Sequence, residues 1–395
     1  MKRVLIIGAS ILQLPAIKRA KELGYYVAVA DYNVEAIGIP HADEYFNVST
    51  VDIDGIVRIA NNFKPDGIMT LATDMPMRAV AKACEVRGLL GISYDTAVKA
   101  TDKGEMIKAF EAHGVEHPWY HIVENRDVLE TMVTRIMYPC IMKPTDNAGS
   151  RGVVLCHGID ELQSKYEYAR RESNSGAVII EEFLQGPEVS VEVMIVDGEP
   201  HVIQITDKLT SGAPHFIEMG HSQPSRQNAT NQDLIKKLAC RACKAVGIET
   251  GPAHVEMILT ENGPKMVELG ARMGGDCIAS HLVPLSTGID MVGSAIKQAC
   301  GEKMDIDIKP KCDKGSAIRY FKSKPGMIKS IEGVEKAQAI TGVREVVIVH
   351  HLGKRVGEIR NSSERIGFVI AQAETAVEAI NVCMEAIQTV HFTIE

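Results

Sequence analysis

Short apolar runs alternate with amphipathic stretches over the first hundred residues. The runs VLII (4–7) and YVAVAD (26–31) have the length and composition of buried strands. Between them, a stretch with helical spacing is opened by Pro15 and closed by Gly24. Strands and helices that alternate in this way predict a parallel sheet covered by helices, so we expect residues 1–100 to form an α/β domain.

The loop after the first strand has the outline of a dinucleotide-binding turn. Gly8-Ala9-Ser10 stands between strand and helix, and Asp31 ends the second strand about twenty residues after the turn begins. A dehydrogenase turn needs glycine at positions 8, 10 and 13, but the chain has Gly8, Ser10 and Gln13. We therefore expect the shape of a nucleotide site without its nucleotide, and we interpret the turn as a candidate wall of an acceptor pocket.

Alternating strands and turns dominate residues 138–275. The dipeptides DG (197–198) and NG (262–263) are hairpin signals between such strands. After Pro310 the runs GSAIRYF, REVVIVH and RIGFVIAQ precede a helical stretch, TAVEAINVCMEAIQ. The pattern predicts a strand-rich middle part followed by a smaller α+β region.

Composition narrows the class of protein. The 395 residues are enough for two or three domains, and 45% hydrophobic with 24% charged residues is ordinary for a globular protein. A net charge of −8 gives no indication of a nucleic-acid partner, and no apolar run is long enough for a membrane span. Nine scattered cysteines favour the reducing cytoplasm. Cys240 and Cys243 lie in a helical run without a second pair, so a metal or redox role is not expected for them.

The segment YPCIMKPTDNAGSRGVVL (138–155) has the features of a phosphate-binding loop. A strand delivers Lys143, a loop carries Gly149, Ser150 and Gly152, and another strand follows. Backbone N–H groups of a small loop can close over a polyphosphate, and a lysine supplies a point charge. No helix N-terminus assists, so a glycine-rich hairpin beside a surface lysine is the alternative interpretation.

The next segment, AVIIEEFLQGPEVSVEV, allows two interpretations. A buried strand, 178–180, ends in Glu181, Glu182 and Phe183, and an alternating strand begins at Glu188. The segment is either a linker whose backbone binds an adenine edge while a carboxylate holds ribose hydroxyls, or a strand that leaves the core with solvated acids.

The stretch HVEMILTENGPKMVELGARMGGD predicts a hairpin that turns around Asn262. Glu256 then faces Glu268, and His254 faces Gly270. Like charges so placed destabilise a sheet unless something compensates them, and a hard divalent cation is the natural compensator. The alternative is two exposed glutamates on the solvated face of a hairpin.

Arg272 follows Glu268 by four residues and stands beside Gly274 and Gly275. A guanidinium with free backbone N–H groups can hold an anionic reaction centre. Two histidines, His215 and His221, flank FIEMG in a Gly/Pro/Ser-rich stretch, either as substrate contacts or as plain surface residues. We expect four loops to shape the substrate pocket, near 8–13, 73–76, 210–226 and 272–280.

In this order, the set resembles the ATP-grasp superfamily of carboxylate–amine ligases. The chain is most like the branch of L-amino-acid ligases and carbamoyl-phosphate synthases, on the stretches GHSQPS, ELGARMGGD and GSAIRYF. The resemblance covers nearly the whole chain and implies a mixed α/β and α+β architecture. Its expected parts are a Rossmann-like pre-ATP-grasp domain (1–100), a two-part ATP-grasp domain (101–305, divided near 181) and a small C-terminal lid domain (306–395).

The resemblance also implies roles for individual residues. Those expected to bind ATP are Lys103, Lys143, Gly149, Ser150, Gly152, Glu181, Phe183, Leu184 and Glu188. Those expected to hold Mg²⁺ are Glu256 and Glu268, and Arg272 is expected to act in catalysis on the acyl phosphate or its tetrahedral adduct. Residues expected to contact substrate are Ser10, His215, His221, His254, Gly274 and Gly275.

The implied activity is an ATP- and Mg²⁺-dependent ligation, with Mn²⁺ as an alternative ion, that forms an amide through an acyl phosphate. The expected partners are a small carboxylate and a small amine, such as amino acids, and a homodimer is compatible with the sequence. The family often has Asn two residues after the second metal-binding glutamate, where this chain has Gly270. Either water completes the shell of a second metal ion or that ion is held less tightly.

Four rival functions are weighed against this interpretation. A dehydrogenase does not explain the paired glutamates, and a non-catalytic sensor would be expected to lose the metal-binding acids or Arg272, all of which are present. A purine-type carboxylase or synthetase is the alternative within the ligases. A biotin carboxylase is disfavoured because no Met-Lys-Met motif is present. The sequence does not name either substrate.

Overall fold

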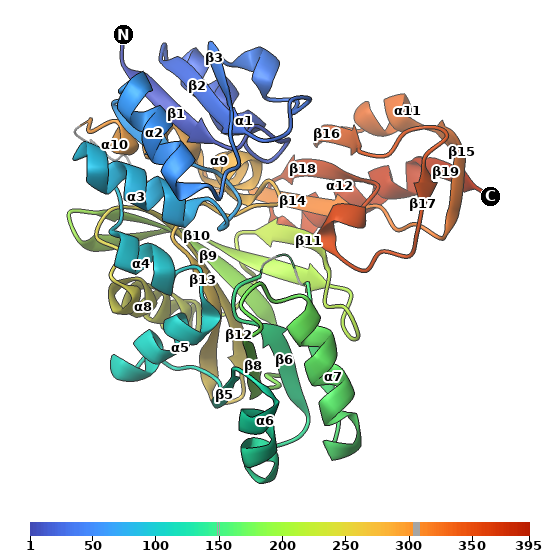
Figure 1. Cartoon of the computed structure of the whole chain (residues 1–395). Coiled ribbons are helices and arrows are strands. Elements are labelled where there is room, and N and C mark those ends of the chain that lie inside the picture. The colour runs from blue at the N-terminus through green and yellow to red at the C-terminus, as the bar shows by residue number, and fades with distance from the viewer. Residues whose placement is uncertain (148, 150, 303–308) are drawn as a thin grey trace.

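The computed structural model of the chain describes residues 1–147, 149, 151–302 and 309–395 (Figure 1). The N-terminal part contains β1 (Arg3–Ile7), α1 (Leu14–Glu22), β2 (Tyr26–Asp31), η1 (Ile39–His41), β3 (Glu44–Asn47), α2 (Ile53–Phe63), β4 (Gly67–Met69), α3 (Met77–Arg87) and α4 (Tyr94–Lys99). Its sheet has the strand order β3-β2-β1-β4, and every pairing in it is parallel. The predicted parallel α/β unit is confirmed.

The middle part begins with a small sheet and its helices. These elements are α5 (Lys103–Ala112), β5 (Tyr120–Val123), α6 (Arg126–Met132), η2 (Val133–Arg135), β6 (Cys140–Pro144), β7 (Val154–Cys156), α7 (Ile159–Arg171) and β8 (Val178–Glu182). The sheet has the order β5-β8-β6-β7 and is antiparallel throughout. It lies at the end of the molecule opposite the N-terminal sheet (Figure 1).

The rest of the middle part and the C-terminal part share one large sheet. The middle elements are β9 (Glu188–Val196), β10 (Glu199–Thr210), β11 (Glu218–Gln223), α8 (Ala229–Val246), β12 (Gly251–Thr260), β13 (Gly263–Gly270), η3 (Ile278–Leu282), α9 (Val283–Thr287) and α10 (Met291–Ala299). The C-terminal elements are β14 (Gly315–Tyr320), β15 (Gly326–Glu332), α11 (Val334–Gln338), β16 (Val343–Ile348), β17 (Arg355–Val356), η4 (Ser362–Glu364), β18 (Gly367–Ala373), α12 (Ala376–Thr389) and β19 (His391–Ile394). The large sheet has the order β13-β12-β9-β10-β11-β14-β18-β16, and a smaller one has the order β17-β15-β19.

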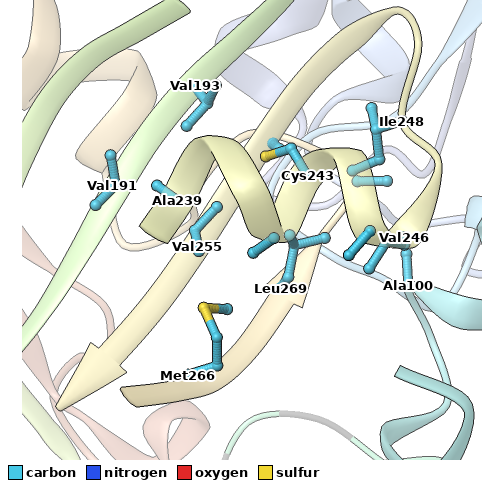
Figure 2. Close-up of a cluster of buried hydrophobic side chains, with 14 of the residues drawn as sticks. Ala100, Val191, Val193, Ala239, Cys243, Val246, Ile248, Val255, Met266 and Leu269 are labelled. Carbon is cyan, nitrogen blue, oxygen red and sulfur yellow. The ribbon is translucent and has the colours of Figure 1, made fainter. Parts of the chain in front are cut away.

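The two faces of the large sheet differ because side chains alternate along each strand. On one face, Val191, Val255 and Leu269 are buried and pack against α8, which contributes Ala239 and Cys243 (Figure 2). Burying one such aliphatic side chain contributes about 2 kcal/mol. The alternate residues of the same strands point to the other face, and these include the acids of the candidate site.

The expected division into three domains stays a prediction, and the hydrophobic cores cross its boundaries. Met291 and Ala295 of α10 share a buried cluster with Val4 and Val27 of the N-terminal sheet. Strand β11 of the middle part pairs with β14 of the C-terminal part. The three parts are therefore joined by common packing as well as by the chain.

The nine cysteines, all of which lie in the described ranges, are free thiols. Burial raises the pKa of the Cys243 thiol on α8, so this cysteine is a packing residue and not a reactive one. Among the described residues, no helix is both long and apolar enough to cross a membrane.

Candidate active site

The two glutamates predicted to face each other lie on the hairpin of β12 and β13. The turn is shorter than predicted, because Thr260 pairs directly with Gly263. From that turn alone, Glu256 would face Val267. A β-bulge beside Glu256 shifts the register, and Glu256 pairs with Glu268. The predicted pairing is confirmed, although it depends on a bulge that was not predicted from the sequence.

A cavity of about 1290 Å³ lies over the polar face of this hairpin. All four loops that were expected to shape the pocket contribute to its wall. The predicted site residues that line it are Ser10, Lys103, Lys143, Gly149, Glu181, Phe183, Leu184, Glu188, His221, His254, Glu256, Glu268, Arg272, Gly274 and Gly275. Gly152 and His215 are not part of this lining, and Ser150 lies outside the described residues.

Two lysines on the cavity wall pair with predicted site glutamates. Lys143 on β6 lies 2.6 Å from Glu181 on β8, and both side chains are buried. Lys103, the first residue of α5, lies 3.0 Å from Glu268 and donates a second hydrogen bond to the carbonyl of Asn147 at 2.7 Å. Burial lowers the pKa of Lys103, but Glu268 outweighs it and the pKa is raised overall. Lys103 is therefore charged and connects the glycine-rich loop to the glutamate pair.

Lys208 on β10 is a central residue of the site that the sequence analysis missed. Its side chain is 2% exposed, and its ammonium lies 2.5 Å from Glu188, 2.9 Å from Glu256 and 3.8 Å from Glu218. Burial lowers its pKa, but the three carboxylates outweigh burial and raise the pKa well above its usual value. The charge compensation that we assigned to a divalent cation is thus supplied here by Lys208 for Glu256 and by Lys103 for Glu268.

His254 is held between two carboxylates. Its Nδ1 contacts the fully buried Glu192, and its Nε2 lies 3.1 Å from Glu256. Burial lowers the pKa of His254, yet Glu192 and Glu256 raise it to about 9. Glu192 also accepts a hydrogen bond of 2.9 Å from the Gly274 N–H. The imidazolium is therefore charged at neutral pH and fixes the orientation of Glu256.

Arg272 reaches across to the N-terminal part of the molecule. It donates to Asp74 at 2.6 Å, and both side chains are largely buried. Buried Asp74 Oδ1 and Arg272 Nε have no hydrogen-bond partner, which costs free energy unless a ligand satisfies them. A Cβ at Gly270 would fall on Asp74 Oδ1 and lie 3.0 Å from Arg272 Cζ. Glycine is needed at position 270 because this ion pair occupies the space where the family often has an asparagine side chain.

The C-terminal part contributes Arg365 to the same cavity. It donates to both carboxylate oxygens of Asp276 at 2.6 Å and stacks on Tyr320, with Cζ 3.7 Å from the ring centroid. His221 lies 3.3 Å from Asp276, and its buried Nδ1 has no partner. Burial raises the pKa of Asp276, but Arg365 and His221 outweigh it and hold the pKa well below its usual range. This ion pair joins the loop after β13 to the C-terminal part.

The N-terminal turn is filled by the protein's own side chains. Gln13 is 2% exposed, accepts a hydrogen bond from the Ser10 hydroxyl at 2.7 Å and donates to the Leu71 carbonyl at 2.6 Å. Asp31 accepts the Ala9 N–H at 2.8 Å, which occupies the acid that a dinucleotide ribose would need. The turn therefore forms part of the cavity wall and has no free phosphate-binding cradle.

The glutamate pair fits a metal ion that arrives with a nucleotide. No three His, Cys, Asp or Glu side chains among the described residues form an all-protein metal site. Mg²⁺ bound to nucleotide phosphates needs only one or two carboxylates, because phosphate oxygens and water complete its shell. Glu256 and Glu268 on one face of the hairpin meet that requirement.

Several of the missed residues had a signal in the sequence. The hairpin of β9 and β10 turns at the predicted DG dipeptide, and counting back from it brings Lys208 to within one residue of Glu188, opposite Pro187; a register shift between Val202 and Gln204 supplies the remaining step. Asp74 lies in a loop that was already expected to border the pocket. Arg365 had no local signal, because it meets Asp276 across 89 residues of chain.

Two known families match the chain. Residues 136–280 match the ATP-grasp domain, and residues 319–395 match the L-amino acid ligase C-terminal domain 2. The chain is 26% identical over 359 residues to the uncharacterized protein y4rH of Sinorhizobium fredii, covering 89% of this chain and 74% of the relative. It is 28% identical over 324 residues to the alanine–anticapsin ligase of Bacillus subtilis strain 168, covering 76% and 67%.

Solved structures show the same fold over the full length. The L-amino acid ligase of Bacillus licheniformis has a TM-score of 0.87 at 23% identity, with 100% of this chain and 99% of that chain covered. Phosphoribosylglycinamide synthetase of Anaerococcus prevotii has a TM-score of 0.80 at 23% identity, with both chains fully covered. Residues 136–280 therefore belong to the ATP-grasp domain family, within the fold that these solved structures share. Residues 319–395 belong to the C-terminal domain 2 of the L-amino acid ligases.

Proposed function

We propose that this protein joins a carboxylate to an amine in an ATP- and Mg²⁺-dependent reaction that releases ADP and phosphate. The observation that carries the proposal is the glutamate pair on β12 and β13. Glu256 and Glu268 face one cavity together with Lys103, Lys143 and Arg272. The lysines can supply positive charge for a triphosphate, and the glutamates can supply oxygen ligands for its metal ion. The arginine can supply a guanidinium for the reacting carbonyl.

ATP is proposed to lie between the small sheet and the large one. Lys103 and Lys143 would exchange their carboxylate partners for phosphate oxygens, while the loop that carries Gly149 closes over the triphosphate. The segment from Glu181 to Leu184 would bind the adenine, and Glu188 the ribose. Gly152 and Ser150 remain part of this proposal through the same loop.

Glu256 and Glu268 are proposed to hold Mg²⁺, which when bound offsets the negative charge of the β- and γ-phosphates. Lys208 and His254 keep the Glu256 carboxylate ionised and oriented, since both donate to it. Lys103 donates to Glu268 and fixes its orientation. The two carboxylates are therefore held in place before any ligand arrives, which reduces the reorganisation that binding requires.

The chemistry is proposed in two transfers. A substrate carboxylate oxygen attacks the γ-phosphorus, the bond to the β,γ-bridging oxygen breaks, and ADP leaves. The amine nitrogen then attacks the acyl carbon, the bond to the phosphate oxygen breaks, and the proton lost by the amine passes to phosphate or water. Arg272 would stabilise the negative charge on the carbonyl oxygen, and its unpartnered Nε is available for this.

We further propose amino acids as substrates, because the related alanine–anticapsin ligase and L-amino acid ligases are named for them. Ser10, His221, His254, Gly274 and Gly275 are the proposed substrate contacts on the cavity wall. His215 is retained as a contact that only loop movement would bring to the cavity. A homodimer and a cytoplasmic location also belong to the proposal.

ADP release on a panel of amino-acid pairs tests the proposed function. We expect turnover with at least one pair, and we expect EDTA to abolish it. A purine-type synthetase would release no ADP with any amino-acid pair and would release ADP with a phosphoribosyl amine or carboxylate. A sensor would bind ATP without turnover on either panel.

A further inference from the structure

The loop between β10 and β11 contains a phenylalanine in an unusual backbone conformation. Phe216 has φ of +49°, which a bulky side chain rarely adopts. Its N–H donates to the Gly212 carbonyl at 2.9 Å, and the Ser211 N–H donates to the Ile217 carbonyl at 2.8 Å. These bonds hold the loop in a closed form, and Ile217 is buried beneath it. Such strain is kept where a side chain has to be aimed at a ligand.

The ring of Phe216 is aimed at the linker after β8. It lies against Phe183, with ring centroids 6.2 Å apart and ring planes tilted by 56°. Both rings border the large cavity. The loop therefore meets the proposed nucleotide end of the cavity, whereas from the sequence we expect the whole stretch 210–226 to shape the substrate pocket.

The nearby wall has the character of a slot for a flat apolar group. Ile141 is the cross-strand partner of Glu181, and Ile258 is the partner of Glu188. Both isoleucines border the cavity, next to the two acids proposed for adenine and ribose. An aromatic base presents two apolar faces and a polar edge, so apolar walls beside a linker backbone suit it.

We propose that Phe216 is a wall of the nucleotide-base site and stacks with Phe183 over the adenine of ATP. The inference rests on the proposed function, because it assumes that ATP binds between the two sheets. The proposal divides the stretch 210–226 into two parts. Residues 211–217 border the nucleotide base, and the strand that begins at Glu218 borders the substrate. Removing the ring then weakens the base contact without touching the groups that bind phosphate.

Binding without turnover tests this proposal. The affinity of the full chain for ATP with Mg²⁺ is measured by calorimetry, next to inorganic tripolyphosphate with Mg²⁺, which has no base. For Phe216→Ala we expect the ATP dissociation constant to rise about tenfold, a loss typical of one base–aromatic stack, with tripolyphosphate unchanged. Tyr168→Ala, which removes an exposed ring from α7, serves as the matched control and should change neither.

Two further variants separate the ring from the fold. Phe216→Gly removes the ring and relieves the strained backbone, so it should retain the melting temperature and still lose ATP affinity. Phe216→Trp in a Trp119→Phe background should keep ATP affinity and show a fluorescence change on ATP binding, because Trp119 is the only native tryptophan.

Unchanged ATP affinity in Phe216→Ala and Phe216→Gly would overturn the proposal. Equal losses for ATP and tripolyphosphate would also overturn it, since they would make the ring a structural support of the loop. A wild-type protein that binds neither ligand would instead contradict the proposed function. The two failures are therefore distinguishable in one titration series.

Discussion

Two described regions of the molecule have the outline of a nucleotide site, and they differ in whether their buried polar groups already have hydrogen-bond partners. In the N-terminal turn, the Ser10 hydroxyl already donates to Gln13 and the Ala9 N–H already donates to Asp31, so these groups are not free for a phosphate or a ribose. In the central cavity, Asp74 Oδ1 and Arg272 Nε are buried without partners. A phosphate site needs unsatisfied donors and mobile counter-ions, and a strand–turn–helix outline does not guarantee either.

The charges of the central cavity are held in pairs that a ligand can replace. Lys143 pairs with Glu181, and Lys103 pairs with Glu268. Each pair lies within hydrogen-bond distance in a largely buried setting, where a ligand with a stronger charge can take the place of one partner. In the N-terminal turn, Gln13 bonds to a hydroxyl and backbone groups and Asp31 accepts a backbone N–H, so these bonds include no ion pair that a ligand could replace.

The largest effect is expected from Glu268→Gln. The change keeps the shape of the side chain and removes the charge that would hold Mg²⁺, so turnover should fall at least ~100-fold, about 2.7 kcal/mol of transition-state stabilisation. ADP release at saturating substrate measures it. Glu261→Gln, in the exposed turn of the same hairpin, is the matched control. Near wild-type turnover in Glu268→Gln would refute the role of the paired glutamates.

A somewhat smaller effect is expected from removing the charge of Arg272. Arg272→Gln should lower kcat on the order of 30-fold, because a donor to the reacting carbonyl is lost, while the ATP dissociation constant changes little. Steady-state kinetics and ATP calorimetry on the same preparation separate the two effects. If only ATP affinity fell, Arg272 would belong to the nucleotide end of the cavity.

Loss of the ion pair of the C-terminal part should appear in stability and its pH dependence. Asp276→Asn leaves Arg365 without its charged partner, so the free energy of unfolding at pH 7 should fall by about 2 kcal/mol after allowance for partial exposure. The folded protein holds the pKa of Asp276 below its ordinary value of 3.8, so the contribution is complete above that pH. It is lost as pH falls, when the carboxylate takes up a proton.

Denaturant titrations of the wild type and Asp276→Asn over a range of acidic pH check this sign. The gap between the two curves should be constant near neutrality and close progressively below pH 4. A gap that widened on acidification would contradict the arrangement of charges seen here.

Gly270→Ala is expected to disturb the Asp74–Arg272 pair. The added methyl group falls on Asp74, so stability should drop by about 1.5 kcal/mol and kcat should fall with it. Gly357→Ala serves as a control for glycine replacement, since its Cβ position has open space and its backbone is outside the left-handed region, as it is at Gly270. Thermal unfolding of both variants makes the comparison. Equal losses would mean that the loss of a glycine, and not the clash with the ion pair, lowers stability.

The smallest effect is expected from Gln13→Gly, which restores one of the missing glycines of the N-terminal turn. It removes three side-chain hydrogen bonds, so stability should fall by about 1 kcal/mol, with ATP affinity unchanged and no binding of NAD. Calorimetry with NAD and with ATP measures both. Binding of NAD by this variant would show that the turn lacks only its glycines.

Most of the fold could be predicted from the sequence because its elements have strong local patterns. The strands and helices of the first hundred residues have clear periodicity, and the DG turn between β9 and β10 lies where predicted. The pairing of Glu256 with Glu268 was predicted from a longer turn than the one that forms, and an unpredicted bulge restores the same register. A bulge of one residue reflects packing against neighbouring strands and leaves no local signal.

The residue types that can bind phosphate and metal follow from the amino-acid sequence alone, because lysines, glycines and carboxylates have fixed chemistry and fixed spacing along strands. How their charges are compensated depends on contacts that form in the folded chain. Lys208, Asp74 and Arg365 come from three separate parts of the chain and pair with Glu256, Arg272 and Asp276, respectively, around one cavity. Such meetings depend on how sheets pack against one another, and the free energy of that packing is distributed over hydrophobic contacts far from the site.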